Sequence, residues 1–90
     1  MNRTIITVVG KDTKGIIAKV CTYLADHNVN ILDISQTIVQ EYFNMMMIVD
    51  MQKIEQPFVE IADELAELGK SIGVQVKCQR EEIFNMMHRI

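Results

Sequence analysis

The stretch whose residue types could most directly do chemistry is a loop bracketed by two glycines, in the run G-K-D-T-K-G-I-I-A-K-V from Gly10 to Val20. Its glycine spacing matches a Walker-type phosphate loop, but Ile16 and Ile17 stand where that loop needs Lys and Ser or Thr. The pattern G-x-G-x-x-G is also missing, so nucleotide binding is not predicted. The first N–H groups of a helix starting here could instead receive a small carboxylate, which Gly15 would allow to approach closely. The competing interpretation is a plain strand-to-helix connection.

A catalytic set would have to come from Cys21, His27 and Asp33. Cys21 and His27 are six residues apart in a predicted helix. This spacing corresponds to a rotation of about 240° around the helix axis, which places the two side chains on different faces. A nucleophilic thiol needs its base within hydrogen-bond distance. His27 is therefore interpreted as a surface histidine at a helix end, and the chain is not predicted to be an enzyme.

No metal site and no cofactor are expected. Four carboxylates lack ligand spacing and are interpreted as caps, turn residues or solvated strand residues: Asp12, Asp26, Asp33 and Asp50. The run from Met45 to Met47 could suggest a soft-metal site, but neighbouring residues in a strand point to opposite faces. Packing in a core or an interface is therefore favoured for these methionines.

The loop must be positioned by the elements on either side of it. Arg3 to Gly10 is rich in Thr, Ile and Val, which favour a pleated backbone and predict the first strand. From Ile16 onward, apolar residues recur with helical spacing along one stripe. Thr13 is expected to cap this helix, and His27-Asn28 to end it, because Asn tolerates the left-handed conformation.

Two strands are predicted next, Val29 to Gln40 and Phe43 to Met51, with the turn at Glu41-Tyr42. In the first of them, one side is expected to be apolar (Leu32, Ile34, Ile38) and the other polar (Asp33, Ser35, Thr37). The odd-numbered residues of the second are all apolar and are expected to share one face.

The last third of the chain repeats a helix and a strand. Gln56-Pro57 is predicted to start the second helix, with proline in the first helical position, and Gly73 to end it. Val74 to Gln79 alternates between apolar and polar residues, which predicts a half-buried fourth strand. Ile83 to Ile90 is predicted to form a short terminal helix that docks either on its own sheet or on a partner.

This βαββαβ order is that of an α+β, ferredoxin-like sandwich with a four-stranded antiparallel sheet and both helices on one face. We expect one domain over residues 1–82 and a helical tail over residues 83–90. The other sheet face would be open, and Met46 with Ile48 would give it an apolar patch. A second copy of the chain is the simplest cover, so a homodimer is expected.

Composition narrows the class of partner. The 90 residues carry a net charge of −3 with scattered Lys and Arg, which does not suit a nucleic-acid backbone. No apolar run approaches the length of a membrane span or the core of a signal peptide. Cys21 and Cys78 are interpreted as small buried hydrophobes in a reduced, cytoplasmic protein.

The loop run, followed by L-A-D-H-N-V-N-I-L-D-I, resembles the start of an ACT domain, which typically reads G-x-D-x-P-G into a helix and then N-I into a strand. The resemblance covers about residues 3–80. The whole chain is also similar to small free-standing bacterial and archaeal ACT proteins, through N-I-L-D-I-S-Q-T-I in the middle and E-E-I-F-N-M-M-H-R-I in the tail. Lys14 stands where proline is common in the family.

The resemblance implies a regulatory module that pairs and binds an amino acid or a similar small molecule, and that acts on an unidentified protein target. It places the ligand between the loop of one subunit and the start of the second strand of another. The implied ligand-binding residues are Asp12, Thr13, Lys14, Gly15, Ile16, Asn28, Asn30 and Ile31. Two alternatives stay open: a purely structural protein-interaction module, and an acylphosphatase-like enzyme, whose chemistry needs an arginine where this loop has only Lys11 and Lys14.

Overall fold

The computed structural model describes residues 3–11 and 14–87 of the 90-residue chain. In chain order the elements are β1 (Arg3–Lys11), α1 (Ile16–Asp26), β2 (Asn30–Val39), β3 (Tyr42–Asp50), α2 (Phe58–Ile72), β4 (Val74–Arg80) and α3 (Glu81–Met87). The predicted βαββαβ order with a terminal helix is therefore confirmed.

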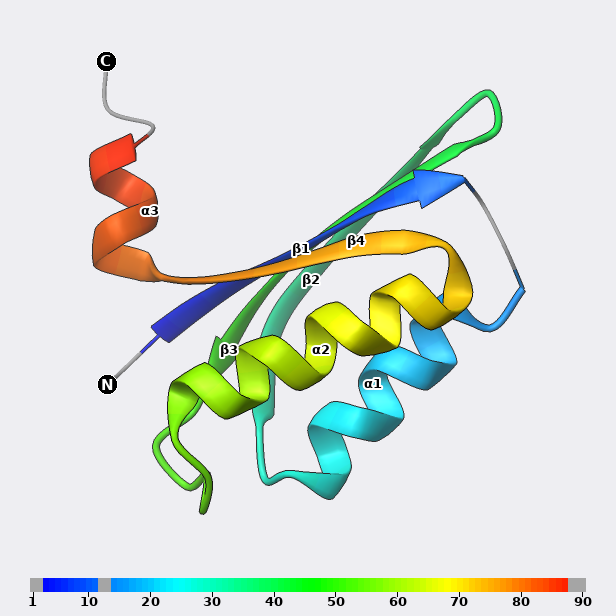
Figure 1. Cartoon of the computed structure of the whole chain (residues 1–90). Coiled ribbons are helices and arrows are strands. Elements are labelled where there is room, and N and C mark those ends of the chain that lie inside the picture. The colour runs from blue at the N-terminus through cyan, green and yellow to red at the C-terminus, as the bar shows by residue number, and fades with distance from the viewer. Residues whose placement is uncertain (1–2, 12–13, 88–90) are drawn as a thin grey trace.

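The four strands form one antiparallel sheet in the order β2-β3-β1-β4. Helices α1 and α2 lie side by side against one face, while α3 leaves the end of β4 on the other side (Figure 1). This is the predicted ferredoxin-like sandwich. It leaves β2 and β4 as the two edge strands of the described sheet, each paired with one neighbour.

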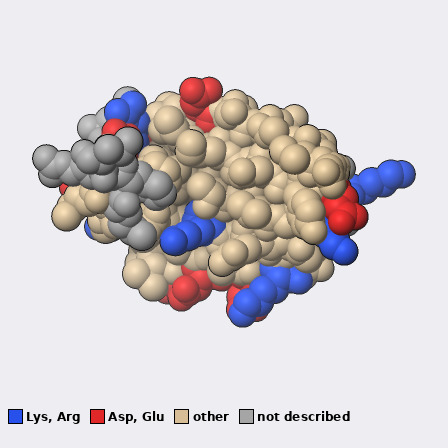
Figure 2. Space-filling view, turned by 90° about the horizontal axis from the view of Figure 1, so that it is seen from above, with Lys and Arg blue, Asp and Glu red and all other residues tan. Residues whose placement is uncertain are grey.

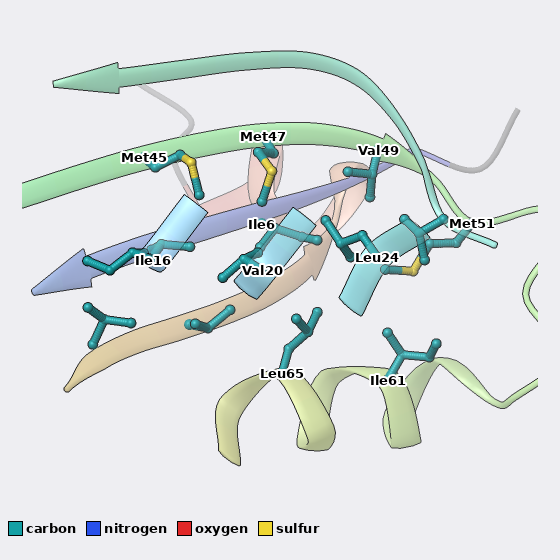
Figure 3. Close-up of a cluster of buried hydrophobic side chains, with 14 of the residues drawn as sticks. Ile6, Ile16, Val20, Leu24, Met45, Met47, Val49, Met51, Ile61 and Leu65 are labelled. Atoms are coloured by element: carbon teal, nitrogen blue, oxygen red, sulfur yellow. The ribbon is translucent and has the colours of Figure 1, made fainter. Parts of the chain in front are cut away.

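The core lies between the sheet and the two long helices. Alternate residues of β1 and β3 point toward the helices, and α1 and α2 return one apolar stripe each (Figure 3). The labelled core residues are Ile6, Ile16, Val20, Leu24, Met45, Met47, Val49, Met51, Ile61 and Leu65. Burying one such aliphatic side chain stabilises the fold by about 1.5–3 kcal/mol. Met45 and Met47 are fully buried here and Met46 is not, as the strand alternation predicted.

The hairpin between β2 and β3 turns one residue earlier than predicted. Gln40 and Glu41 form the turn, and Tyr42 already pairs with Val39. Gln40 adopts a left-handed backbone with φ 56°, the conformation that tight hairpin turns require. The sequence offers no Gly or Asn here to mark the position, which is why the turn was misplaced.

Strand β2 differs from its predicted alternation at one point. The polar side is as expected, since Asp33, Ser35 and Thr37 lie opposite residues of β3 on the open face. A bulge between Ile31 and Asp33 leaves Leu32 without a partner in the register, so it does not belong to the same regular row as Ile34. An extra residue of this kind bends a strand and re-aims its side chains.

Helix ends were predicted to within one or two residues. His27 and Asn28 end α1, with Asn28 at φ 61°, and Gly73 ends α2 at φ 81°. Pro57 occupies the capping position of α2 rather than its first turn, and α3 begins two residues early, at Glu81. The predicted end of the tail lies outside the described residues.

The two cysteines are less buried than predicted. Cys21 and Cys78 are both half-buried free thiols, and Cys78 packs against the edge of the core. Burial raises the pKa of both thiols, that of Cys78 to about 12. Both therefore stay protonated at neutral pH and have little nucleophilic character.

Candidate functional site

The loop between β1 and α1 supplies the first half of the candidate site. Gly15 precedes α1 with φ 86°, and the space that a side chain would occupy there is open. Ile16 is buried and anchors the start of the helix, while Lys14 is exposed. The predicted contributions of Asp12 and Thr13 lie outside the described residues, and it is Gly15 that occupies the capping position.

The first turn of α1 has backbone donors to offer. Lys19 N–H already donates to Gly15 O at 2.9 Å, as the first helical bond of the ladder. The backbone N–H groups of the preceding residues of this turn have no partner within the helix, and Gly15 has no side chain that could accept from them. These donors and the positive end of the helix dipole favour a negatively charged group in this position.

The start of β2 supplies the second half. Asn28 holds a left-handed backbone at the end of α1, and Asn30 begins the strand two residues later with an exposed side chain. Ile31 is half-buried and packs against the core, so it fixes the position of its neighbour. The carboxamide of Asn30 can both donate and accept hydrogen bonds.

A single chain does not bring these two halves together. Gly10 of β1 lies opposite Phe43, and Phe43 lies opposite Ile38 of β2, so the loop leaves the sheet beside the C-terminal end of β2. Asn30 pairs with Asp50 at the opposite end. β2 has 10 residues, which at about 3.3 Å per residue separates its ends by about 30 Å.

A polar cluster between the helices was missed by the sequence reasoning. The Tyr23 hydroxyl donates to Glu64 Oε1 at 2.5 Å, and the His27 ring stacks on Tyr23 with centroids 3.9 Å apart. His27 Nδ1 lies 2.8 Å from the Tyr23 carbonyl oxygen, and Nε2 lies 3.6 Å from Glu64 Oε1. His27 is at a helix end, as predicted, but it is half-buried and engaged. The spacing of Tyr23 and His27 along the helix could be recognised in the sequence, whereas their contact with Glu64 on α2 could not.

The cluster has a clear electrostatic character. Burial and the adjacent Glu64 carboxylate raise the pKa of Tyr23, which keeps its hydroxyl a hydrogen-bond donor. Hydrogen bonds from Tyr23 and Gln56 lower the pKa of Glu64, which keeps it ionised. The cluster ties the C-terminal end of α1 to α2. It therefore holds the turn that leads into Asn30.

Comparison with known proteins identifies the family. A model of the ACT domain matches residues 2–79, nearly the whole of the folded sandwich. The chain belongs to the ACT domain family. ACT domains in general are regulatory modules that bind small molecules, amino acids in particular.

Two relatives of this ACT domain match it over the whole of both chains. A UPF0237 family protein of Bifidobacterium longum is 63% identical over 90 residues, covering all of both chains. One from the archaeon Methanocaldococcus jannaschii is 46% identical over 90 residues, again covering both completely. The solved ACT domain protein from Streptococcus pneumoniae is 41% identical, with a TM-score of 0.81 over 92% of this chain and 93% of that one.

None of the helices in residues 3–11 and 14–87 is long and apolar enough to cross a membrane. Within the same residues, no group of three or more His, Cys, Asp or Glu side chains is placed to hold a metal ion.

Proposed function

We propose that the protein is a homodimeric regulatory ACT domain that binds an amino acid or a similar small carboxylate between two protomers. The observation that carries the proposal is the separation of the two half-sites at opposite ends of β2. Each half-site is incomplete in one chain, and a particular pairing of two chains completes both.

That pairing joins the free edges of two β2 strands about a two-fold axis. Antiparallel edge pairing places the N-terminal end of one β2 beside the C-terminal end of the other. Asn30 of one protomer then lies next to Val39 of its partner, at the end of the sheet where the partner's loop and Gly15 are found. Two equivalent sites result.

The β2 edge has the surface that such an interface needs. Ile34 and Ile38 point to the helix side of the sheet, opposite buried residues of β3, yet they are 43% and 55% exposed. Their exposure follows from the position of β2, which lies at the sheet edge and makes few contacts with α1. Exposed apolar edge strands are usually paired or covered in native proteins.

The two half-sites are chemically complementary to an amino acid. The backbone donors at the start of α1 suit the carboxylate, and the exposed Lys14 ammonium adds positive charge nearby. Asn30 of the partner can accept a hydrogen bond from the amino group through its carbonyl oxygen. Ligand binding would tighten the dimer, because the site exists only when both protomers are present.

Regulation requires that a second molecule, the target, respond to the tightening of the proposed dimer. A ligand changes the state of a target only if the target distinguishes the bound from the free form. We place the module in the cytoplasm, where its two thiols would stay reduced. We propose that its target is another protein.

A thermal-shift screen of the twenty amino acids and related carboxylates tests the proposal. A ligand at about 100 times its dissociation constant stabilises the folded form by about 2.7 kcal/mol. Asn30→Ala should abolish the shift, whereas Asn44→Ala, which removes another exposed asparagine of the same sheet, should leave it intact.

Three outcomes count against the proposal. If no compound stabilises the wild type, amino-acid binding is wrong and the purely structural interaction module becomes the better description. If a ligand binds equally well to Asn30→Ala, the site lies elsewhere. If the liganded protein is a monomer by sedimentation, the two-protomer site is wrong.

A further inference from the structure

A cavity of about 600 Å³ lies at the end of the sheet where β1 begins and β4 ends. Figure 1 shows that α3 stands at this end, whereas the end of β1 and the start of α1 lie at the opposite end. The cavity is walled by the strands, by the connection from β3 into α2, and by α3. Its volume falls within the range of about 300–1,000 Å³ that small-molecule sites occupy.

One wall of the cavity is apolar and rigid. Met51, Ile54 and Phe58 line it. Met51 belongs to the buried core, and the other two are half-buried and pack against that core. Because these side chains pack against the core, the wall is formed before any ligand binds. An apolar group placed against it would be removed from water without a rearrangement of the protein.

Arg80 supplies a positive charge beside that wall. It is the last residue of β4, and its register partner Thr4 is buried on the helix side of the sheet, so the Arg80 side chain points toward α2. The Arg80 Cζ atom lies 4.9 Å from the centroid of the Phe58 ring. A guanidinium that lies over an aromatic ring leaves its in-plane N–H groups free to donate two hydrogen bonds to a carboxylate.

Arg80 differs from the other arginine of the cavity. Arg3 is already neutralised by Glu81, since its Nε lies 2.6 Å from Glu81 Oε2 and its second terminal nitrogen donates to Oε1 at 2.8 Å. In the described part of the chain, no carboxylate forms an ion pair with Arg80. The cavity therefore combines an apolar wall with Arg80, a cation that forms no ion pair in the described residues, while Glu82 also lines the cavity.

We propose that this cavity binds a small carboxylate with an apolar body, separately from the loop site. Arg80 takes the carboxylate, and Met51, Ile54 and Phe58 contact the apolar body. Asn85 of α3 also lines the cavity, so an occupied site ties α3 to the sandwich. Because Arg80 is followed directly by α3, ligand binding at the end of β4 also fixes the point from which the tail helix starts.

Amide chemical shifts of the isotope-labelled, full-length protein test this site with a matched set of three probes. Leucine and its α-keto acid both carry a carboxylate on the same apolar body, and isoamylamine is leucine without that carboxylate. We expect saturable shifts at Phe58, Arg80 and Asn85 with both carboxylates, and none there with the amine. Arg80→Gln should raise the dissociation constant at least about tenfold, which is the effect expected from the loss of one charge-assisted hydrogen bond.

Lys77→Gln is the matched control, because it removes an exposed cation from the same strand on the opposite face. It should leave the affinity unchanged, as should Asn30→Ala. Binding that survives Arg80→Gln, or equal binding of isoamylamine, would overturn the proposal, and so would the absence of saturable shifts around Arg80. Shifts confined to Gly15 and Asn30 would also overturn it while supporting the loop site, so the two proposals can fail independently.

Discussion

At the scale of single residues, the Glu64 carboxylate is where the polar contacts between the helices converge. Tyr23 donates to Glu64 Oε1, and Gln56 donates to Oε2 at 3.2 Å. His27 Nε2 lies 3.6 Å from Oε1. Since a backbone carbonyl can only accept, the contact from His27 Nδ1 to Tyr23 O places a proton on Nδ1. The end of α1 is thereby fixed by side chains rather than by the backbone alone.

The Tyr23→Phe variant should lose stability at neutral pH and lose less of it in acid. The pKa of Glu64 is lowered in the folded chain, mainly by the Tyr23 hydroxyl. A carboxylate of this kind stabilises the fold above its ordinary pKa, and the contribution disappears as pH falls through the lowered value. Urea unfolding of wild type and variant across acid pH measures the difference, with Tyr42→Phe, an exposed tyrosine, as control. A difference that does not depend on pH would contradict this role of Glu64.

At the scale of elements, the packing of α2 on the sheet depends on a close approach at Gly69. A methyl group added there would lie 2.7 Å from the Val74 carbonyl oxygen and 2.8 Å from Val76 Cγ2. These atoms belong to β4, the strand that follows α2 after Gly73. The helix and the strand it leads into are therefore pressed together where only glycine fits.

The Gly69→Ala variant should be destabilised by about 1–3 kcal/mol, because the clash forces α2 away from β4. The sign is diagnostic, since Gly→Ala at an open helical position stabilises by about 1 kcal/mol. Chemical denaturation measures the change. Asp63→Ala, at an exposed position of the same helix, serves as the matched control and should be close to neutral or slightly stabilising. An increase in stability for Gly69→Ala would show that the approach is looser than described.

At the scale of the whole molecule, two of the surfaces with exposed apolar side chains belong to the sheet. One is the β2 edge with Ile34 and Ile38, and the other is the open sheet face with Met46. Figure 2 shows the molecule from the side away from α1 and α2, where uncharged residues fill most of the centre and charged ones lie mainly toward the rim. Either surface could receive a second copy, and our proposal assigns the interface to the β2 edge because pairing there joins the two candidate half-sites.

The Ile38→Lys variant should therefore convert the proposed homodimer into a folded monomer and abolish the proposed amino-acid binding, because it places a charge in the proposed edge interface. The expected loss of dimer affinity is at least about tenfold. Met46→Lys places the same charge on the open face and should leave the dimer intact. Sedimentation velocity over a range of protein concentrations measures both. Dissociation by Met46→Lys and not by Ile38→Lys would assign the interface to the open face instead.

The order of elements, the buried faces and most helix ends could be predicted from the sequence alone. Periodicity identified the buried rows of β3 and the stripes of both long helices because alternation and helical spacing are local properties. Gly73 and Asn28 were identified as helix ends because their backbone conformations are rare for other residues. The hairpin turn was misplaced since Gln40 carries no such preference, and its left-handed backbone is imposed by the pairing of β2 with β3.

Only the tertiary structure decided how the functional groups are distributed. The candidate residues of the loop and of β2 can be recognised in the sequence, but their separation by the length of the sheet follows from strand order and register. Glu64 is far from Tyr23 along the chain, and Arg80 is far from Met51, so no local pattern connects them. Local spacing determines which face of an element is buried. Which elements become neighbours is determined by the packing of the whole chain.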